Sequence, residues 1–463
     1  MSRKLKIALV YPRLKIPTGD PPLGVAYLAS HLRKMTDSET EIFVIDSTFH
    51  PSLNYIFDRL TAIQPDLVGI YADTMMYADA VKIARKSRQL EAQVVIGGPH
   101  PTVMPETVTA EADAVVIGEG ENTLASIVNK FPVRDWRAIS GIAYQKDGQL
   151  EKTPPARFVE NLDQLDFPAL DLLEMDKYLD LWHYLDCLDL KIKGTSILTS
   201  RGCPFQCSYC QPALSKIFGQ KLRRRSPENV VEEMRYLKDR YKLGAVFFHD
   251  DTFTVDKSWV EKICRLSEKE NSDLLWVCNT RADTIDELMM KKMYAAGLRK
   301  CHLGAESGSQ RVLDEIYHKQ IKVEQIKSVS AAAQRQKIKI LCFFMLGGPG
   351  ETVKEIKQTI KLAVSLPIQE ATFSLTTPLP HTYLYDKIAA SGEYQISQNF
   401  ADYNYYAHRV FESKHLSSRR VKCFQLQALM KFYLHPRRWG YISKHLFSFT
   451  GFKKLLRKVK RSI

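Results

Sequence analysis

The sequence predicts an α/β protein with two successive parallel-sheet domains, and three observations support this prediction. Short apolar runs of strand type alternate with helical patterns over about the first 130 residues, a second alternation begins at Thr195, and a stretch with several prolines and weak periodicity separates the two. Strands that alternate with helices favour right-handed crossovers and parallel sheets. We therefore expect a doubly wound, Rossmann-like parallel sheet, then a barrel-type sheet, then a mainly helical C-terminal region.

Length and composition fit a globular protein and exclude several other classes. The chain has 463 residues, of which 45% are hydrophobic and 25% charged, so disorder is not expected. Nine cysteines show no regular disulfide framework, and there is no apolar run long enough for a transmembrane helix. The N-terminal residues Met1-Ser2-Arg3-Lys4 lack the apolar core of a signal peptide. We expect a cytoplasmic protein in a reducing compartment.

The first alternation predicts five strands and their connecting helices. The strands are expected at residues 5–11, 41–45, 67–71, 93–97 and 113–117. The helices are expected from Pro22-Leu23 onward and at residues 53–63, 75–90, near 104–111 and 121–129. Ligands of such sheets bind beyond the carboxyl ends of the strands. The loops there are rich in glycine and proline, which fits close approach to a ligand but equally fits ordinary tight turns.

The second alternation predicts six strands, at residues 195–199, 245–248, 274–278, 300–304, 339–346 and 371–376. Six strand-helix units are too few for a complete eight-stranded barrel. A partial barrel with an open side is therefore expected.

Three cysteines follow the first of these strands. Cys203, Cys207 and Cys210 lie within eight residues. Iron-sulfur clusters are normally held by four cysteine thiolates, so three in one loop leave one iron open to another ligand. A structural zinc site would need a fourth cysteine or histidine nearby, and a triplet this close cannot pair fully in disulfides. An iron-sulfur cluster is the leading interpretation, with zinc as the alternative.

Polar residues and glycines also follow the later strands, where barrel geometry places ligand contacts. Ionised carboxylates are acceptors, an arginine fork can pair with a carboxylate, and glycines permit close approach of the backbone. For the acids, helix capping and turn chemistry are the competing interpretations. For the glycines after the fifth strand, a phosphate loop is excluded because the pattern GxxxxGK[ST] is missing. The candidates are Asp250, Asp251, Asn279, Arg281, Glu306, Ser307, Gly347 and Gly348.

The cysteine loop resembles the CxxxCxxC signature of the radical S-adenosylmethionine (SAM) superfamily. The resemblance implies that Cys203, Cys207 and Cys210 hold a 4Fe-4S cluster whose open iron binds SAM. It also implies that the eight strand-end candidates contact SAM, and that reductive cleavage of SAM produces a 5'-deoxyadenosyl radical. A partner that donates electrons, such as flavodoxin or ferredoxin, is then expected.

The strings PPLGVAYLAS, GGPHPT and GEGE resemble the cobalamin-binding domain of cobalamin-dependent radical SAM enzymes. The resemblance implies cobalamin as a further cofactor. The motif DxHxxG, which supplies a lower histidine ligand in other cobalamin domains, is absent. His50 and His100 are therefore interpreted as loop histidines rather than cobalt ligands. The cobalamin contacts implied are Pro22, Leu23, Thr74, Gly97, Gly98, Pro99, His100, Gly118, Glu119 and Gly120.

These features predict a cobalamin-binding domain at residues 1–135, a linker at 136–194, a radical SAM core at 195–385 and a basic, aromatic region at 386–463. Methylation of an unactivated carbon is the leading reaction, by analogy with the family. Cyclisation, ring contraction and carbon-carbon coupling are the alternatives within the class. A non-catalytic cobalamin or metal sensor that binds nucleic acid is the alternative from another class. No catalytic residue is assigned beyond the cofactor contacts.

The C-terminal tail is basic and aromatic. Residues 431–463 hold ten lysines or arginines and no acid, and the chain carries a formal net charge of +14. One interpretation is an amphipathic helix lying on an anionic membrane, which favours a lipid-like substrate over another small molecule. The other is a terminal helix packed on the core. Nucleic acid is not the expected partner, because the cysteine loop and its supporting motifs favour an enzyme.

Overall fold

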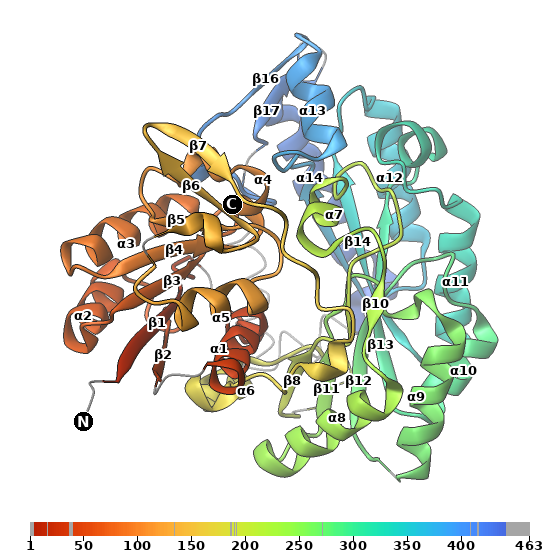
Figure 1. The fold of residues 1–463 in the computed structure, drawn as a ribbon. Helices are drawn as coiled ribbons and strands as arrows, with labels where there is room; N and C mark the ends of the chain where they lie inside the picture. Colours follow the sequence, from red (N-terminus) through yellow and green to blue (C-terminus); the bar gives the residue numbers. More distant parts are fainter. Residues whose placement is uncertain are drawn as a thin grey trace. The chain divides into compact units, whose positions relative to one another are not determined.

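The computed structural model describes residues 4–440 apart from residues 16, 37–39, 134, 186–187, 189, 191, 271, 408 and 414–415. The chain divides into two compact units (Figure 1). The first comprises Met1–Trp182, Ser200–Pro204 and Pro212–Ser226, and the second comprises His183–Thr199, Phe205–Gln211 and Pro227–Ile463.

The first unit contains a seven-stranded sheet in the order β2-β1-β3-β4-β5-β6-β7. The five parallel strands are β1 (Leu5–Tyr11), β2 (Thr40–Asp46), β3 (Leu67–Tyr71), β4 (Gln93–Gly97) and β5 (Ala114–Val116). Their order, 2-1-3-4-5, is one of the two common doubly wound orders, with its switch point between β1 and β3. The predicted Rossmann-like sheet is therefore confirmed, with strand limits within one residue of the expected ones.

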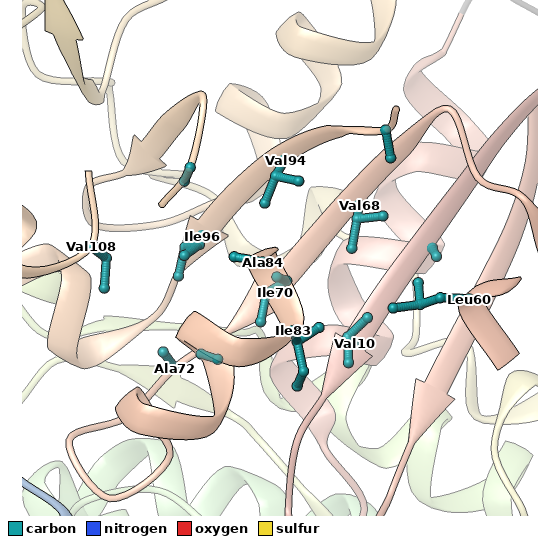
Figure 2. Close-up of a cluster of buried hydrophobic side chains, with 14 of the residues drawn as sticks. Val10, Leu60, Val68, Ile70, Ala72, Ile83, Ala84, Val94, Ile96 and Val108 are labelled. Carbon is teal, nitrogen blue, oxygen red and sulfur yellow. The ribbon is translucent and has the colours of Figure 1, made fainter. Parts of the chain in front are cut away.

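Helices cover both faces of this sheet because its buried strands are apolar on both sides. Along β1, Ile7 and Leu9 pack toward α1 (Leu23–Met35) and α5 (Glu121–Asn129), while Ala8 and Val10 pack toward α2 (Leu53–Ile63) and α3 (Tyr77–Gln89). Figure 2 shows the second of these clusters, with Val10, Val68 and Ile70 of neighbouring strands against Ile83 and Ala84 of α3. The alternation of one strand thus builds two hydrophobic cores.

One part of the first unit differs from the prediction, and another adds two strands to the predicted sheet. The helix expected near residues 104–111 is replaced by α4 (Pro99–Val103) and a short 3-10 turn (Pro105–Thr107), because Pro99 can begin a helix while Pro105 interrupts one. The hairpin β6 (Ile142–Lys146) and β7 (Gln149–Lys152) pairs antiparallel with β5 and so extends the sheet. Its two-residue turn, Asp147-Gly148, has φ values of 52° and 78°, as a tight hairpin of this type requires.

The remaining elements of the first unit are short. They are 3-10 turns at Trp136–Ala138, Leu162–Gln164 and Leu170–Leu172, α6 (Met175–Leu181), the two-stranded ribbon β9 (Ser200–Arg201) and β10 (Arg223–Arg224), and α7 (Ala213–Phe218).

The second unit contains the predicted six-stranded sheet, in the order β15-β14-β13-β12-β11-β8 and parallel throughout. The strands are β8 (Gly194–Ile197), β11 (Ala245–Phe248), β12 (Leu275–Thr280), β13 (Leu298–Glu306), β14 (Lys339–Leu346) and β15 (Glu370–Leu375). The connecting helices are α8 (Pro227–Tyr241), α9 (Lys257–Lys269), α10 (Glu287–Ala295), α11 (Val323–Arg335) and α12 (Val353–Ser365) (Figure 1). Sequential order with parallel pairing is the arrangement of a partial barrel.

Smaller elements complete the second unit. They are a 3-10 turn at Phe253–Val255, a π-helix at Val312–Ile316, α13 (Tyr383–Ala390), the hairpin β16 (Tyr394–Ile396) and β17 (Phe411–Ser413), a 3-10 turn at Phe400–Asp402, α14 (Ser418–Tyr433) and a 3-10 turn at Pro436–Arg438. The long helix α14 packs on β15. No helix among the described residues is both long and apolar enough to cross a bilayer.

Candidate cofactor site

The cysteine loop begins immediately after β8 and is tied to the strand beside it. The buried carboxylate of Asp250, which follows β11, accepts hydrogen bonds from the Thr199 backbone N–H and hydroxyl, all at 3.0 Å. Gly202 then takes a left-handed φ of 86°, where a side chain would be strained. Asp250 therefore positions the chain that leads into the three cysteines.

The three cysteines differ in exposure. Cys203 is half-buried in the first unit, while Cys207 is buried and Cys210 exposed in the second, and none forms a disulfide. No three His, Cys, Asp or Glu side chains among the described residues are placed to share one metal ion. A 4Fe-4S cluster does not require that arrangement, because each cysteine binds a different iron. Three thiols in one loop are the donor set that such a cluster uses.

The second half of the loop is fixed to two distant segments of the second unit. The Ser208 hydroxyl donates to the Ile316 carbonyl at 2.6 Å, and its N–H donates to the Tyr317 carbonyl at 2.9 Å. The Tyr383 N–H, at the start of α13, donates to the Gln211 carbonyl at 2.7 Å. These contacts hold the backbone of Cys207 and Cys210 in place.

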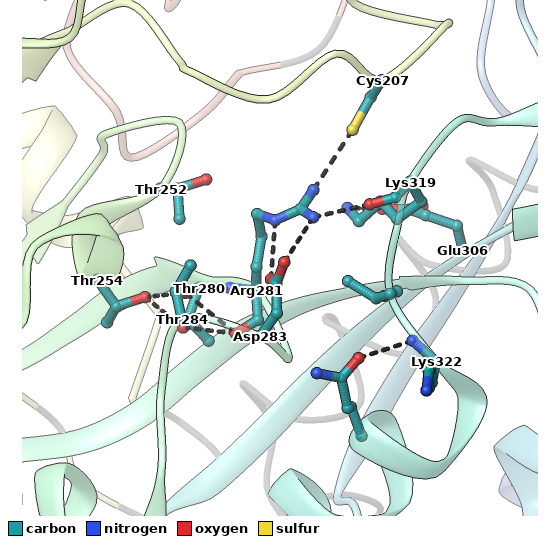
Figure 3. Close-up of polar contacts among 12 residues, drawn as sticks. Cys207, Thr252, Thr254, Thr280, Arg281, Asp283, Thr284, Glu306, Lys319 and Lys322 are labelled. Atoms are coloured by element: carbon teal, nitrogen blue, oxygen red, sulfur yellow. Dashed lines mark hydrogen bonds and ion pairs between the residues drawn. The ribbon is translucent and has the colours of Figure 1, made fainter. Parts of the chain in front are cut away.

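Arg281, which follows β12, lies directly against this loop (Figure 3). Its Nη1 is 3.4 Å from the Sγ of Cys207, and its guanidinium lies 3.6 Å above the Phe205 ring. Asp283 pairs with it in fork geometry, with both bonds at 3.0 Å, and the Lys319 carbonyl accepts from Nη2 at 2.7 Å. The fork of Arg281, an expected SAM contact, is thus engaged by Asp283, and its cation sits beside the Cys207 sulfur.

Glu306, at the end of β13, forms a buried ion pair that the sequence did not reveal. Its carboxylate lies 3.0 Å from Lys319 Nζ and 3.3 Å from the Tyr209 hydroxyl, which is itself 3.1 Å from Lys319 Nζ. Burial and the charge of Glu306 raise the pKa of Tyr209 well above its usual value. Gly304 makes room for the pair, because a Cβ there would lie 2.6 Å from the Glu306 carboxylate oxygen. Tyr209 of the cysteine loop is therefore held directly beside the Glu306–Lys319 ion pair.

Lys319 reaches this position through unusual backbone. It follows the π-helix Val312–Ile316, and its neighbours His318 and Gln320 have φ values of 48° and 56°. Glu306 itself has a φ of 59°. Left-handed conformations of non-glycine residues carry strain and gather at functional sites. No local sequence pattern predicts such a segment, which explains why Lys319 was missed.

The two acids after β11 have different environments. Asp250 is engaged by Thr199, and the Asn279 side-chain amide donates to the Asp250 carbonyl at 2.7 Å. The Asp251 side chain reaches solvent but is closely surrounded by protein, and its carboxylate makes no hydrogen bond to any described residue. Desolvation by the surrounding protein, together with the charge of Asp250, raises the pKa of Asp251 to about 6. Of this pair, Asp251 is the acceptor available to a ligand.

Ser307, Gly347 and Gly348 have structural partners. The buried Ser307 hydroxyl lies 3.1 Å from that of Thr359 on α12. The N–H groups of Gly347 and Gly348 donate to one carboxylate oxygen of Glu351 at 2.6 and 2.9 Å. Burial raises the pKa of Glu351 to about 7. These three residues shape the carboxyl edge of the sheet at the ends of β13 and β14.

The second sheet turns one face toward its helices and the other toward the interior of the partial barrel. Phe344 and Phe373 lie 5.4 Å apart on neighbouring strands, and Phe373 contacts Phe432 of α14 at 6.2 Å, so this face meets the helices. Residues alternating with these face the interior. Phe343 and Met345 of β14, with Thr372 and Ser374 of β15, are in register there and only partly buried.

The interior is layered. Lys300 and Glu370 form a buried ion pair at 2.9 Å near the starts of their strands. Above it, the Tyr184 ring packs 4.5 Å from Phe247 and 5.5 Å from His302, and Phe343 lies 5.8 Å from His302. The interior therefore has a charged floor, an aromatic middle and a partly exposed upper layer.

In the first unit, the loop after β4 is built around a buried histidine. His100 Nδ1 lies 3.3 Å from the Thr74 hydroxyl, and Nε2 lies 3.1 Å from that of Thr107. Burial lowers the pKa of His100 to about 4, which keeps the ring neutral. Gly98 has a φ of 115°, and a Cβ there would lie 2.7 Å from the Ala72 carbonyl oxygen. Both ring nitrogens of His100 thus have protein partners.

His50 is held by other contacts. Its Nε2 lies 2.8 Å from a Glu174 carboxylate oxygen, and its ring stacks on Tyr55 at 4.2 Å. Like His100, which lies in α4, His50 is held by protein partners.

Glu119 is the most heavily engaged of the expected cobalamin contacts. Arg223 binds both of its carboxylate oxygens, at 2.7 and 3.0 Å, and Arg201 binds one at 3.0 Å. Arg201 also pairs with Glu121 at 2.6 Å. All of these side chains are almost fully buried. The flanking residues Gly118, with a φ of 78°, and Gly120, the N-cap of α5, complete a turn whose charge is neutralised by the β9–β10 ribbon.

The other expected cobalamin contacts lie at the carboxyl edge of the first sheet. Pro22 and Leu23 begin α1, and Gly97 and Pro99 flank Gly98. Sequence reasoning missed further polar residues at this edge. Asp73 accepts from the Met75 and Met76 N–H groups at 2.8 Å, and Asp46 accepts from the Tyr178 hydroxyl. Tyr178 comes from the predicted linker, so no pattern near Asp46 could have indicated the contact.

A doubly wound domain with a polar carboxyl edge, together with a partial parallel barrel carrying a three-cysteine loop, defines a cobalamin-dependent radical SAM enzyme. Residues 14–128 match the B12 binding domain, and residues 197–363 match the radical SAM superfamily. A protein of Pyrococcus horikoshii, described as an uncharacterized methyltransferase, is 33% identical over 99% of this chain and 98% of its own length. The chain therefore belongs to the radical SAM superfamily, among members with a B12-binding domain.

Other relatives have different names within the same family. An anaerobic magnesium-protoporphyrin IX monomethyl ester cyclase of Rubrivivax gelatinosus is 29% identical over 80% of this chain and 66% of its own length. The radical SAM methyltransferase TsrM of Kitasatospora setae, solved with cobalamin and a [4Fe-4S] cluster, superposes with a TM-score of 0.71 over 93% of this chain and 82% of its own. At 19% identity it supports the fold. The family defines the cofactors as a 4Fe-4S cluster, SAM and cobalamin.

Proposed function

We propose that this enzyme methylates an unactivated carbon of an apolar, lipid-like small molecule. The observation that carries the proposal is the loop of Cys203, Cys207 and Cys210, with Arg281 against Cys207 and the unengaged carboxylate of Asp251 at the next strand end. When bound, the cluster and SAM supply a 5'-deoxyadenosyl radical and cobalamin supplies a methyl group.

In this proposal the protein holds and orients the cofactors. The three cysteines bind the cluster, and Asp251 accepts from the amino group of SAM. Asn279, Glu306, Ser307, Gly347 and Gly348 line the edge where the rest of SAM lies, while Asp250 and Arg281 position the loop. The cobalamin contacts are the carboxyl-edge residues of the first sheet: Pro22, Leu23, Thr74, Gly97, Gly98, Pro99, His100, Gly118, Glu119 and Gly120.

The barrel interior supports an apolar substrate. Its middle layer is aromatic, and its upper layer offers Phe343 and Met345 together with the hydroxyls of Thr372 and Ser374. A largely apolar molecule with one or two polar groups would be complementary to such a surface. The Lys300–Glu370 pair closes the floor.

Methyl transfer can be tested with SAM that carries a trideuteromethyl group. Anaerobically reconstituted enzyme, a reductant and an extract of apolar metabolites should yield 5'-deoxyadenosine and a product with the labelled methyl group. Cys210→Ala should abolish both, while Cys423→Ala, which removes another exposed cysteine, should retain both.

Radical cyclisation is the second candidate, because the relative from Rubrivivax gelatinosus is named a cyclase. The same experiment separates the two. Formation of 5'-deoxyadenosine with a new product that lacks the label would support cyclisation, ring contraction or coupling and would exclude methyl transfer.

A further inference from the structure

The outer side of α14 carries a stripe of exposed apolar side chains. Leu426, Met430 and Leu434 are 39%, 56% and 66% exposed, and Trp439 in the following turn is 62% exposed. The first three are spaced by four residues and so lie along one side of the helix. Four of the ten large apolar side chains exposed among the described residues fall in this short segment. Such clustering marks an interaction surface.

A basic groove lies beside this stripe. It has a volume of about 650 Å³ and runs between α12, α14 and the turn after α14. Its lining includes the apolar side chains of Ile360 and Val364. The side chains with cationic or imidazole groups that line it are Lys357, Lys361, Lys431, His435 and Arg437, and no acid lines it.

The cations of the groove lack ion pairs with described residues, unlike several cations on the other helices of the second unit. Lys357, Lys361, Lys431 and Arg437 form no ion pair with any residue that the structure describes. On α8, α9, α10 and α11, by contrast, lysines and arginines pair with nearby acids. Lys262 pairs with Glu228, Lys292 with Glu261 and Arg335 with Glu287 between helices, and Lys238 pairs with Asp273 in the loop before β12. The groove is therefore a concentration of uncompensated positive charge.

The turn that carries His435 and Arg437 is anchored to α12. The buried guanidinium of Arg438 donates to the carbonyls of Ala363, Val364 and Leu366 at 3.2 to 3.4 Å, and it stacks on Phe432 at 3.6 Å. Arginine at a helix C-terminus satisfies carbonyls that have no partner within the helix. This anchor fixes the groove and the apolar stripe relative to each other.

We propose that α14, the turn at residues 434–439 and the basic half of α12 form a docking surface for an anionic lipid bilayer. The groove complements phosphate headgroups, and the stripe Leu426, Met430, Leu434 and Trp439 complements the acyl region. Exposed apolar residues flanked by lysine and arginine are the physical requirement for such peripheral contact. The proposal does not depend on the reaction that the enzyme catalyses.

Other occupants fit less well. Nucleic acid offers phosphates but would leave the aliphatic side chains of the stripe without an apolar partner. Residues 441–463, which lie outside the described residues, hold seven lysines or arginines and no acid, so they do not complement the groove in charge. They would instead add to the attraction for an anionic surface.

The test is co-sedimentation of the full chain with vesicles of phosphatidylcholine alone or with phosphatidylglycerol. Binding should require phosphatidylglycerol and weaken with salt, and Lys361→Glu/Lys431→Glu should weaken it at least about tenfold. Leu434→Ser/Trp439→Ser should also weaken it, although these changes leave the charge unaltered. The control is Lys269→Glu/Lys291→Glu, with the same change of charge at exposed lysines of α9 and α10, which should bind like the wild type.

Several results would overturn the proposal. Equal binding to both kinds of vesicle, or no binding to either, would do so, and so would an equal loss of vesicle binding in the groove and control variants. Full vesicle binding by the groove variant would assign the contact to residues 441–463. Tight binding of RNA without vesicle binding would make nucleic acid the partner. Release of 5'-deoxyadenosine by the groove variant in detergent solution tests the enzyme separately, so that failure of the reaction and failure of docking remain distinguishable.

Discussion

Arg281 places Nη1 3.4 Å from the Sγ of Cys207, at the end of a network that begins with Asp283 and includes the Lys319 carbonyl. A guanidinium in this position sets positive charge beside a sulfur that, in the proposed cluster, would bind iron as a thiolate. Arg281 is thus a positioning residue for the cysteine loop.

Arg281→Lys should keep the charge but lose the fork to Asp283, because an ammonium cannot form two parallel bonds to a carboxylate while reaching the Lys319 carbonyl. We expect the rate of reductive SAM cleavage to fall at least about tenfold, since each hydrogen bond to a charged group contributes about 1.5–3 kcal/mol. The measurement is 5'-deoxyadenosine release, with cluster content determined in parallel. Arg335→Lys, at the exposed fork with Glu287, is the control, and equal rates in both variants would contradict the assigned role.

Removing one partner of the Glu306–Lys319 ion pair should lower the free energy of unfolding far more than removing both partners. Both side chains are under 10% exposed, so Lys319→Met or Glu306→Gln alone leaves a buried charge and should lower the free energy of unfolding by about 3–5 kcal/mol. The double variant should recover much of that loss. Urea unfolding of the apo-protein measures this, with the exposed pair Lys292–Glu261 as a reference expected to contribute about 0.2–1 kcal/mol. Additive losses in the double variant would show that the two charges act independently.

Glu119→Gln should loosen the turn between β5 and α5. The change leaves Arg201 and Arg223 with less compensating charge in a buried site. We therefore expect the free energy of unfolding to fall by about 3 kcal/mol or more. Hydrogen exchange should increase in peptides around residues 118–128 and 219–224. Glu111→Gln, which disrupts the exposed pair with Arg85, should change stability by about 1 kcal/mol at most. Unchanged exchange in Glu119→Gln would mean that the ion pairs do not hold the turn.

His100 should make stability depend on pH. Its pKa is lowered to about 4 in the folded protein from an ordinary value of 6.5, so between these values the unfolded chain binds the proton more strongly. The free energy of unfolding should therefore fall as the pH drops from about 6.5 to 4, by up to roughly 3 kcal/mol. His100→Gln should flatten this dependence, whereas His318→Asn, at an exposed histidine, should retain it. An identical slope in wild type and His100→Gln would contradict the assignment.

The strands and their positions along the chain were largely predictable from the sequence, because buried parallel strands are short, continuous apolar runs bounded by turn residues. The limits of β1, β3, β4, β11 and β14 agree with the predicted ones. The prediction of a helix near residues 104–111 was wrong, because prolines at positions 99 and 105 each begin a separate short helical turn. The pairing of β6 with β5 could not be read from the hairpin alone, since edge pairing depends on which strand is left uncovered.

Residue types at the strand ends were predictable, but their partners were not. Arg281, Glu306 and Glu119 stand where expected, yet Asp283, Lys319 and Arg223 determine what their charges do. Such contacts join residues up to 104 positions apart and depend on backbone such as the left-handed residues around Lys319. The basic aromatic tail was recognised in the sequence, and its described part exposes Leu434 and Trp439 just after α14. Its residues 441–463 lie outside the described part of the chain.

Low-temperature electron paramagnetic resonance of the reduced, anaerobically reconstituted protein tests the central claim most directly. A three-cysteine loop that holds a cluster with one open iron predicts about four irons and four sulfides per chain and a cluster signal that changes when SAM is added. The signal should be lost in Cys210→Ala and retained in Cys423→Ala. Bound zinc without a cluster, or a cluster signal that SAM leaves unchanged, would contradict the account.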